Sequence, residues 1–105
     1  MAAPYNPPVK NEEFKIRISL EDYANPGNFK SNPTIAAGDF KVDIDGGGLN
    51  NLGTLPSVSP AGSVLVLVTL AAAEMNGDVI TLVCIDQTTV KEWSDLVISI
   101  PTTSA

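Results

Sequence analysis

The stretch Gly38–Leu55, which reads GDFKVDIDGGGLNNLGTL, decides the fold of this chain. In its first half Phe40, Val42 and Ile44 alternate with charged residues, which is the period-two pattern of a strand with one buried face. Glycines 46–48 follow, and they permit the positive backbone angles of a tight reversal before two leucines lead back. The stretch therefore predicts a β-hairpin in a small antiparallel protein.

Four other segments carry strand patterns, and with the hairpin they predict about six or seven strands. These segments are Phe14–Leu20, Ser63–Leu70, Val79–Ile85 and Glu92–Ile100. Ser63–Leu70 reads SVLVLVTL and is apolar on both faces, so we expect both faces to be covered, the second one by an assembly. In the last segment Leu96, Ile98 and Ile100 should point inward. The sequence TLAAAEM at 69–75 predicts a single helical turn.

Short strands separated by turn signals predict an all-β fold, a small antiparallel β-sandwich, because two packed sheets bury these apolar faces economically. The strand, turn and strand around Glu74 resemble the corner before strand F of immunoglobulin-like domains, although the corner tyrosine and the cysteine pair are absent. We expect one immunoglobulin-like domain at residues 12–101, an extended proline-rich arm at 1–11 and a short tail at 102–105.

Two segments outside the strands are candidate partner-binding regions. Tyr5, Pro7 and Pro8 lie in the arm, where proline favours extended backbone and the tyrosine offers an anchor on a neighbouring subunit; a frayed terminus is the alternative. The connection at 21–38 is long for so small a domain, and such loops are often functional. We expect its apolar residues Tyr23, Phe29 and Ile35 to hold it in place, and we count Tyr23 and Phe29 among the partner-binding residues. Trp93 fits either core packing or an interface anchor.

Composition excludes several classes of function. The 105 residues carry a formal net charge of −6 with no basic stripe, which disfavours nucleic acid and anionic membranes as partners. The chain has no histidine, so a serine or cysteine nucleophile would lack its usual base. The single cysteine, Cys84, sits in an apolar run and is expected to be buried and inert. The first ten residues contain no signal-like apolar segment, so we expect synthesis in the cytosol.

The carboxylates of the hairpin raise the question of a metal site. Asp43 and Asp45 match the first and third positions of a calcium-binding EF-hand loop, but the fifth and twelfth positions are Gly47 and Thr54, which cannot supply the required carboxylates. We therefore expect no metal and no cofactor. The chain also has few aromatic residues for a sugar platform, and we expect no enzymatic activity.

Several stretches resemble a type of small domain found in structural proteins of tailed bacteriophages. The resemblance covers roughly residues 30–100 and also the start of the chain. Its segments are Asn32–Val42 with Asp45–Gly47, Leu52–Pro60 (LGTLPSVSP), Leu70–Asp78 (LAAAEMNGD), Glu92–Asp95 (EWSD) and Ala2–Pro8. They are fold-forming segments without an active-site motif, so the resemblance implies a β-sandwich in a virion and no reaction.

Within that resemblance we expect a capsid decoration (head auxiliary) protein, made in the host cytoplasm and carried on the capsid exterior. Its partners would be the major capsid protein or other virion proteins, together with further copies of itself, for example in a trimer. A lone acidic domain with a clamping arm suits such a role. Two alternatives stay open: a tail or baseplate subunit, and a receptor- or carbohydrate-binding module, for which an exposed aromatic patch would be the discriminating feature.

Overall fold

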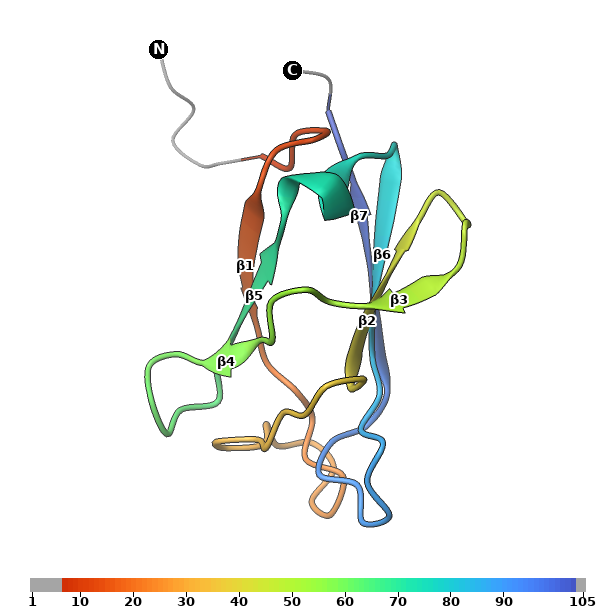
Figure 1. Cartoon of the computed structure of the whole chain (residues 1–105). Helices are drawn as coiled ribbons and strands as arrows, with labels where there is room; N and C mark the ends of the chain where they lie inside the picture. Colours follow the sequence, from red (N-terminus) through yellow and green to blue (C-terminus); the bar gives the residue numbers. More distant parts are fainter. Residues whose placement is uncertain (1–6, 104–105) are drawn as a thin grey trace.

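The computed structural model, which describes residues 7–103, is a sandwich of two antiparallel sheets (Figure 1). Its elements are β1 (Phe14–Ile18), β2 (Phe40–Ile44), β3 (Leu49–Asn51), β4 (Ser57–Val58), β5 (Val66–Leu70), the 3₁₀ helix η1 (Ala72–Met75), β6 (Val79–Cys84) and β7 (Leu96–Pro101). One sheet has the order β1-β5-β4 and the other β3-β2-β6-β7. The predicted all-β sandwich is confirmed.

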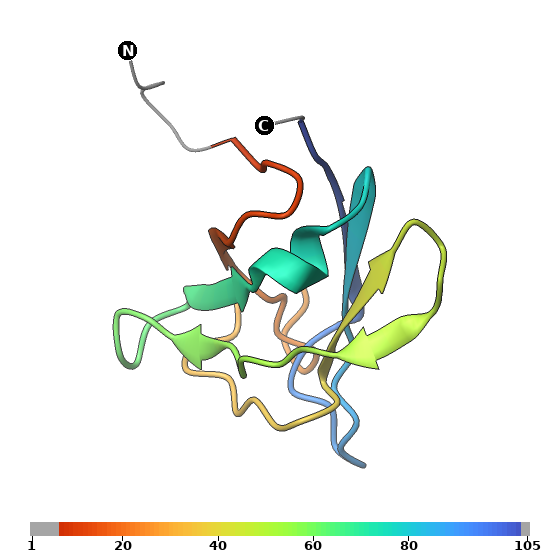
Figure 2. The ribbon, with the colours of Figure 1, turned by 45° about the horizontal axis from the view of Figure 1, so that its top comes forward.

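The strand order is that of an immunoglobulin-like domain. If β1 is read as strand B, the two sheets become B-E-D and C′-C-F-G, the arrangement of the immunoglobulin sandwich. The turn η1 then lies at the corner between strands E and F, where the sequence places Glu74. Figure 1 shows η1 at one end of the sandwich, and Figure 2 shows β2 and β3 extending to the side as a hairpin. Helical content is confined to this one predicted turn within the described residues.

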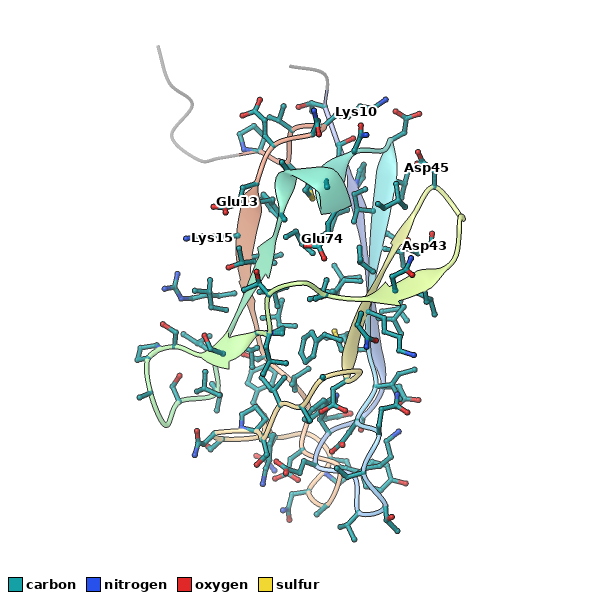
Figure 3. The ribbon with its side chains drawn as sticks, in the orientation of Figure 1. Lys10, Glu13, Lys15, Asp43, Asp45 and Glu74 are labelled. Carbon is teal, nitrogen blue, oxygen red and sulfur yellow. The ribbon has the colours of Figure 1, made fainter. Side chains whose placement is uncertain are left out.

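The β2–β3 hairpin is built by its own aspartates. The Asp43 carboxylate accepts the amides of Gly46 and Gly48, both at 2.8 Å, and so closes the turn. Asp45 adopts a positive φ of 53°, and its Oδ1 accepts the amides of Asp78 and Val79 at 2.9 Å each. These bonds tie the hairpin to the start of β6 (Figure 3). The two carboxylates suggested by a calcium-like spacing therefore serve backbone donors.

Two strands begin later than the sequence predicts, and one short strand was not predicted. The strand predicted from Ser63 begins at Val66. The Ser63 amide donates a hydrogen bond to the Pro60 carbonyl at 3.2 Å, and this bond holds Ser63 in a turn. The connector between Pro56 and Pro60 contains β4, a two-residue strand that was not predicted. The last strand begins at Leu96, since the residues from Glu92 onward belong to a loop.

The core lies between the sheets and is formed by the inward positions of the central strands. Its fully or almost fully buried apolar residues are Leu20, Phe40, Val42, Val66, Val68, Leu70, Met75, Ile80, Leu82, Cys84, Trp93 and Ile100. Leu96 and Ile98 pack against this core, so the predicted inward face of β7 is confirmed. In β5 only one face is fully buried, whereas Leu67 and Thr69 on the other are half-buried.

The ends of the described chain lie together at the η1 end of the sandwich (Figure 1). Val9 forms a parallel bridge with Thr103, whose amide donates to the Pro8 carbonyl at 2.9 Å. The Asn11 amide donates to the Met75 carbonyl at 2.9 Å. The last residues of the predicted arm are thus bonded to the domain. Within residues 7–103 no helix is long and apolar enough to cross a membrane.

Candidate functional site

The predicted partner-binding residues do not form one surface. Figure 1 shows segment 7–11 at the η1 end and the loops 21–38 and 86–95 at the opposite end. Pro7 is exposed and Pro8 half-buried, while Tyr5 lies outside the described residues. The arm and the long loop would therefore contact partners on opposite ends of the domain.

The loop end presents three large apolar side chains to solvent. Their exposed fractions are 54% for Tyr23, 61% for Phe29 and 82% for Val90. We call these three residues the loop-end surface. Binding residues are disproportionately located on loops that a rigid scaffold positions. Sequence reasoning found the two aromatic residues and missed Val90, whose only signal was an aliphatic residue inside a predicted turn.

Backbone hydrogen bonds hold the start of the long loop. The Tyr23 amide donates to the Glu92 carbonyl at 3.1 Å, and the Ser94 amide donates to the Glu21 carbonyl at 3.0 Å. Phe29 forms an antiparallel bridge with Glu21. The prediction that Tyr23 and Phe29 pin the loop is wrong, because both are more than half exposed. Ile35, the third residue named for this role, does pack against the core.

Two buried carboxylates organise the loops beneath the loop-end surface. Asp86 is 3% exposed and accepts the Glu92 amide at 2.7 Å, the Thr88 amide at 2.9 Å and the Thr88 hydroxyl at 2.8 Å. Asp39 is 2% exposed and accepts the amides of Ala36 and Gln87 at 2.9 and 3.0 Å. Every donor in both sets lies in a loop, so these two side chains replace the hydrogen bonds that a regular element would supply.

The charge environment keeps Asp86 ionised. Burial alone would raise its pKa, but hydrogen bonds from Glu92 and Thr88, aided by the charge of Lys91, outweigh that effect and lower the pKa below its ordinary value of 3.8. Lys91 in turn forms an ion pair with Asp95, which raises the pKa of the lysine. Its ammonium also lies 5.7 Å from the centre of the Tyr23 ring, within the range of a cation–π contact.

Trp93 lies beneath this region and is fully buried. Its ring is 6.1 Å from that of Phe40 at an interplanar angle of 53°, and its indole N–H donates to the Cys84 carbonyl at 3.4 Å. The backbone of Trp93 forms an antiparallel β-bridge with that of Asp22, so this core residue holds segment 21–23 in place. Burial decides between the two interpretations of Trp93: it is a core residue, and its place among the partner-binding residues is corrected.

The single thiol of the chain is buried. Burial raises the pKa of the Cys84 thiol to about 12, and the chain contains no histidine to activate it. In the part of the chain that the structure describes, no three acidic, histidine or cysteine side chains converge as metal ligands would. The arrangement at the loop end is suited to binding through surface contact.

A shallow cleft of about 390 Å³ occupies the η1 end. It is lined by Pro7, Val9, Glu12, Glu13, Phe14 and Lys15. The lining mixes charges of both signs with apolar groups. The side chains of Glu13, directly before β1, and of Lys15, within β1, project toward solvent (Figure 3).

No family of proteins, no curated protein and no solved structure matches this chain.

Proposed function

We propose that this chain is a non-enzymatic structural protein of a bacteriophage virion, and specifically a capsid decoration protein that binds the major capsid lattice in many copies. The virion assignment rests on the resemblance of the segments quoted above to domains of tailed-phage structural proteins. The observation that carries a binding role is the loop-end surface, where Tyr23 and Phe29 are more than half exposed on a loop fixed by backbone bonds.

The mechanism is associative. A loop already held by the Tyr23–Glu92 and Ser94–Glu21 bonds loses little conformational entropy when it docks, so more of the contact energy contributes to affinity. Aromatic side chains supply large contact areas with few rotatable bonds. Each copy would bury a modest area, and repetition over the lattice, or oligomerisation, would make attachment durable.

The test is add-back of the purified protein to undecorated phage heads, read by sedimentation and by copy number per particle. We expect stoichiometric binding at lattice numbers, and a reduction of at least about tenfold in affinity for Tyr23→Ala combined with Phe29→Ala. Leu49→Ala is the matched control, because Leu49 is 51% exposed but lies in β3. Binding to tails instead of heads would overturn the decoration proposal in favour of a tail subunit.

The arm is tested separately by deleting residues 1–7. This truncation keeps Val9 and its bonds to Thr103, so the domain should stay folded while attachment weakens. Full loading of the truncated protein onto heads would contradict a role for the arm.

A receptor- or carbohydrate-binding module is the second candidate, because such a module would also use the exposed aromatic side chains of Tyr23 and Phe29. Sugars stack on exposed aromatic rings, and a cell-surface receptor could use the same side chains. Binding to host cells or to purified surface glycans, abolished by Tyr23→Ala and absent with heads, would support this candidate.

A further inference from the structure

The positive charges of this acidic chain are placed unevenly. All six lysine and arginine side chains, and all twelve carboxylate side chains, lie within the described residues 7–103. Two ion pairs form there, and they use Lys10 and Lys91. Of the remaining cations, Lys15 and Arg17 share one strand, β1, and both are exposed. They are two positive charges without an ion pair on a chain whose formal charge is −6.

Both side chains lie on the outer face of the β1-β5-β4 sheet. The register places Thr69 opposite Lys15 and Leu67 opposite Arg17, and it places Ser57 of β4 on the other side of Leu67. We call these five residues the cationic sheet face, and none of them is a carboxylate. Side chains two residues apart on one face of a strand are separated by about 6.5 Å. The face therefore presents two cations at that spacing, beside two hydroxyl groups and one leucine.

The Arg17 guanidinium lies across the sheet. Its Nε donates to the Ser59 carbonyl at 3.4 Å, and Ser59 directly follows β4, on the far side of β5 from β1. The side chain therefore crosses β5, where Leu67 is half-buried although it points outward. Protecting the edge of β1 would require only a charge that extends into water. Within the described residues the two terminal amino groups of Arg17 form no hydrogen bond, so they remain available as donors.

We propose that the cationic sheet face binds a protein segment that presents two carboxylates about 6.5 Å apart, the spacing of alternate residues in an extended strand. The planar guanidinium can donate two parallel hydrogen bonds to one carboxylate, and the Lys15 ammonium supplies a point charge for the other. Because Nε already bonds to Ser59, the guanidinium loses little rotational freedom on binding. Glu13 lies two positions before Lys15 and weakens its attraction for an anion, so Arg17 is the main anchor.

A protein segment fits this face better than a nucleic acid does. Duplex DNA carries one negative charge for about every 1.7 Å of its axis, and its binding proteins neutralise several phosphates at once. Here the row of cations ends after two, and the net charge of −6 repels a polyanion that extends beyond it. An acidic protein segment needs only two charges in the contact, and its uncharged side chains can lie against Leu67 and Thr69.

The experiment is a titration of the isotope-labelled full chain with two short synthetic peptides, followed by NMR. One peptide has glutamate at alternate positions, and in the other every glutamate is replaced by glutamine. We expect the glutamate peptide to shift the Arg17 Nε–H and the backbone amides of β1 and β5, with a Kd of about 1 mM that rises with salt. The glutamine peptide should shift none of them. The titration needs no phage heads, so its failure would leave the add-back test of the loop-end surface unaffected.

Three variants separate the anchor from general electrostatics. Arg17→Glu reverses the anchor charge and should weaken binding of the glutamate peptide by about tenfold or more. Arg17→Lys keeps the charge but loses the two parallel bonds, and it should weaken binding by about threefold. Lys41→Glu is the matched control, because it changes the net charge as Arg17→Glu does but lies on the outer face of the other sheet, and binding should stay within about twofold of wild type. Circular dichroism and thermal melting verify that each variant is folded.

Three outcomes would overturn the proposal. In the first, the glutamate and glutamine peptides shift the same amides, or Arg17→Glu binds the glutamate peptide as wild type does. In the second, the shifts in β1 and β5 appear without peptide as protein concentration rises, because a second copy then occupies the face. In the third, a single-stranded oligonucleotide produces the same shifts at a lower concentration than the glutamate peptide, which would assign the face to nucleic acid.

Discussion

Replacing Asp86 with asparagine should destabilise the domain through the loop network. The amide side chain keeps the size of the carboxylate but turns one oxygen into an N–H₂ group, so either the Glu92 amide or the Thr88 amide faces another donor. A hydrogen bond to a buried charged group contributes about 1.5–3 kcal/mol, and the orphaned amide adds to the loss. We expect Asp86→Asn to lower the free energy of unfolding by about 2–3 kcal/mol at neutral pH, measured by urea denaturation. For a domain of this size each kcal/mol corresponds to a fall of about 4–8 °C in Tm.

The pH dependence of this loss follows from the sign of the pKa shift. The pKa of Asp86 in the folded protein lies below its ordinary value of 3.8, so its stabilisation is fully present above that pH. It is lost as the pH falls through the lower, folded value. The difference between wild type and Asp86→Asn should therefore shrink below about pH 4.

Asp95→Asn is the matched control, because Asp95 is 55% exposed in its ion pair with Lys91 and the change should stay within about 0.5 kcal/mol. The reasoning is refuted if Asp86→Asn unfolds within about 0.5 kcal/mol of wild type at neutral pH, or if the difference between the two does not depend on pH.

Two further perturbations test the hairpin and the core. A Cβ at Gly77 would lie 2.5 Å from Ile44 Cγ2 and 2.8 Å from Asp45 Oδ2, so Gly77→Ala should cost about 2–3 kcal/mol in urea unfolding. Gly53→Ala, where a Cβ meets nothing within 4 Å, should stay within about 0.5 kcal/mol, and equal effects of the two would contradict this account. Burial raises the pKa of the Cys84 thiol from 9.0 to about 12, so near pH 8 a thiol-reactive disulfide reagent should label folded protein about a thousandfold more slowly than urea-unfolded protein. Rapid labelling without denaturant would show that Cys84 is accessible.

Much of the sandwich could be predicted because local periodicity encodes it. The alternation in segment 40–44 predicted that Phe40, Val42 and Ile44 face the core. In the structure this strand, β2, pairs with β6, and the same three side chains point into the sandwich. Glu74 marked the corner between β5 and β6, where its carboxylate accepts the Ala71 amide at 2.8 Å and the Gly53 amide at 3.0 Å. The alternation and the bond between Glu74 and Ala71 depend on a two-residue repeat or on neighbours a few residues away, which a single sequence displays, whereas the bond to Gly53 is a tertiary contact.

The candidate site was only partly predictable. Tyr23 and Phe29 were recognised as residues of a long loop, but their exposure follows from the pairing of segment 21–23 with segment 92–94, which lies near the other end of the chain. The same pairing buries Trp93, which the sequence left open between core and interface. The structural roles of Asp86 and Asp39 depend on the amides of Glu92 and Gln87, which the fold brings to these carboxylates, so no local pattern marked them.

The sequence by itself determined the class of fold, the approximate strands, the acidic surface and the inert thiol, because composition and period-two patterning act locally. Only the tertiary structure decided which side chains remain exposed, which strands lie at the edges of the sheets and where segments 8–10 and 102–103 meet. Exposure of a residue depends on contacts between segments far apart in sequence, such as Val9 with Thr103, and no local pattern records those contacts.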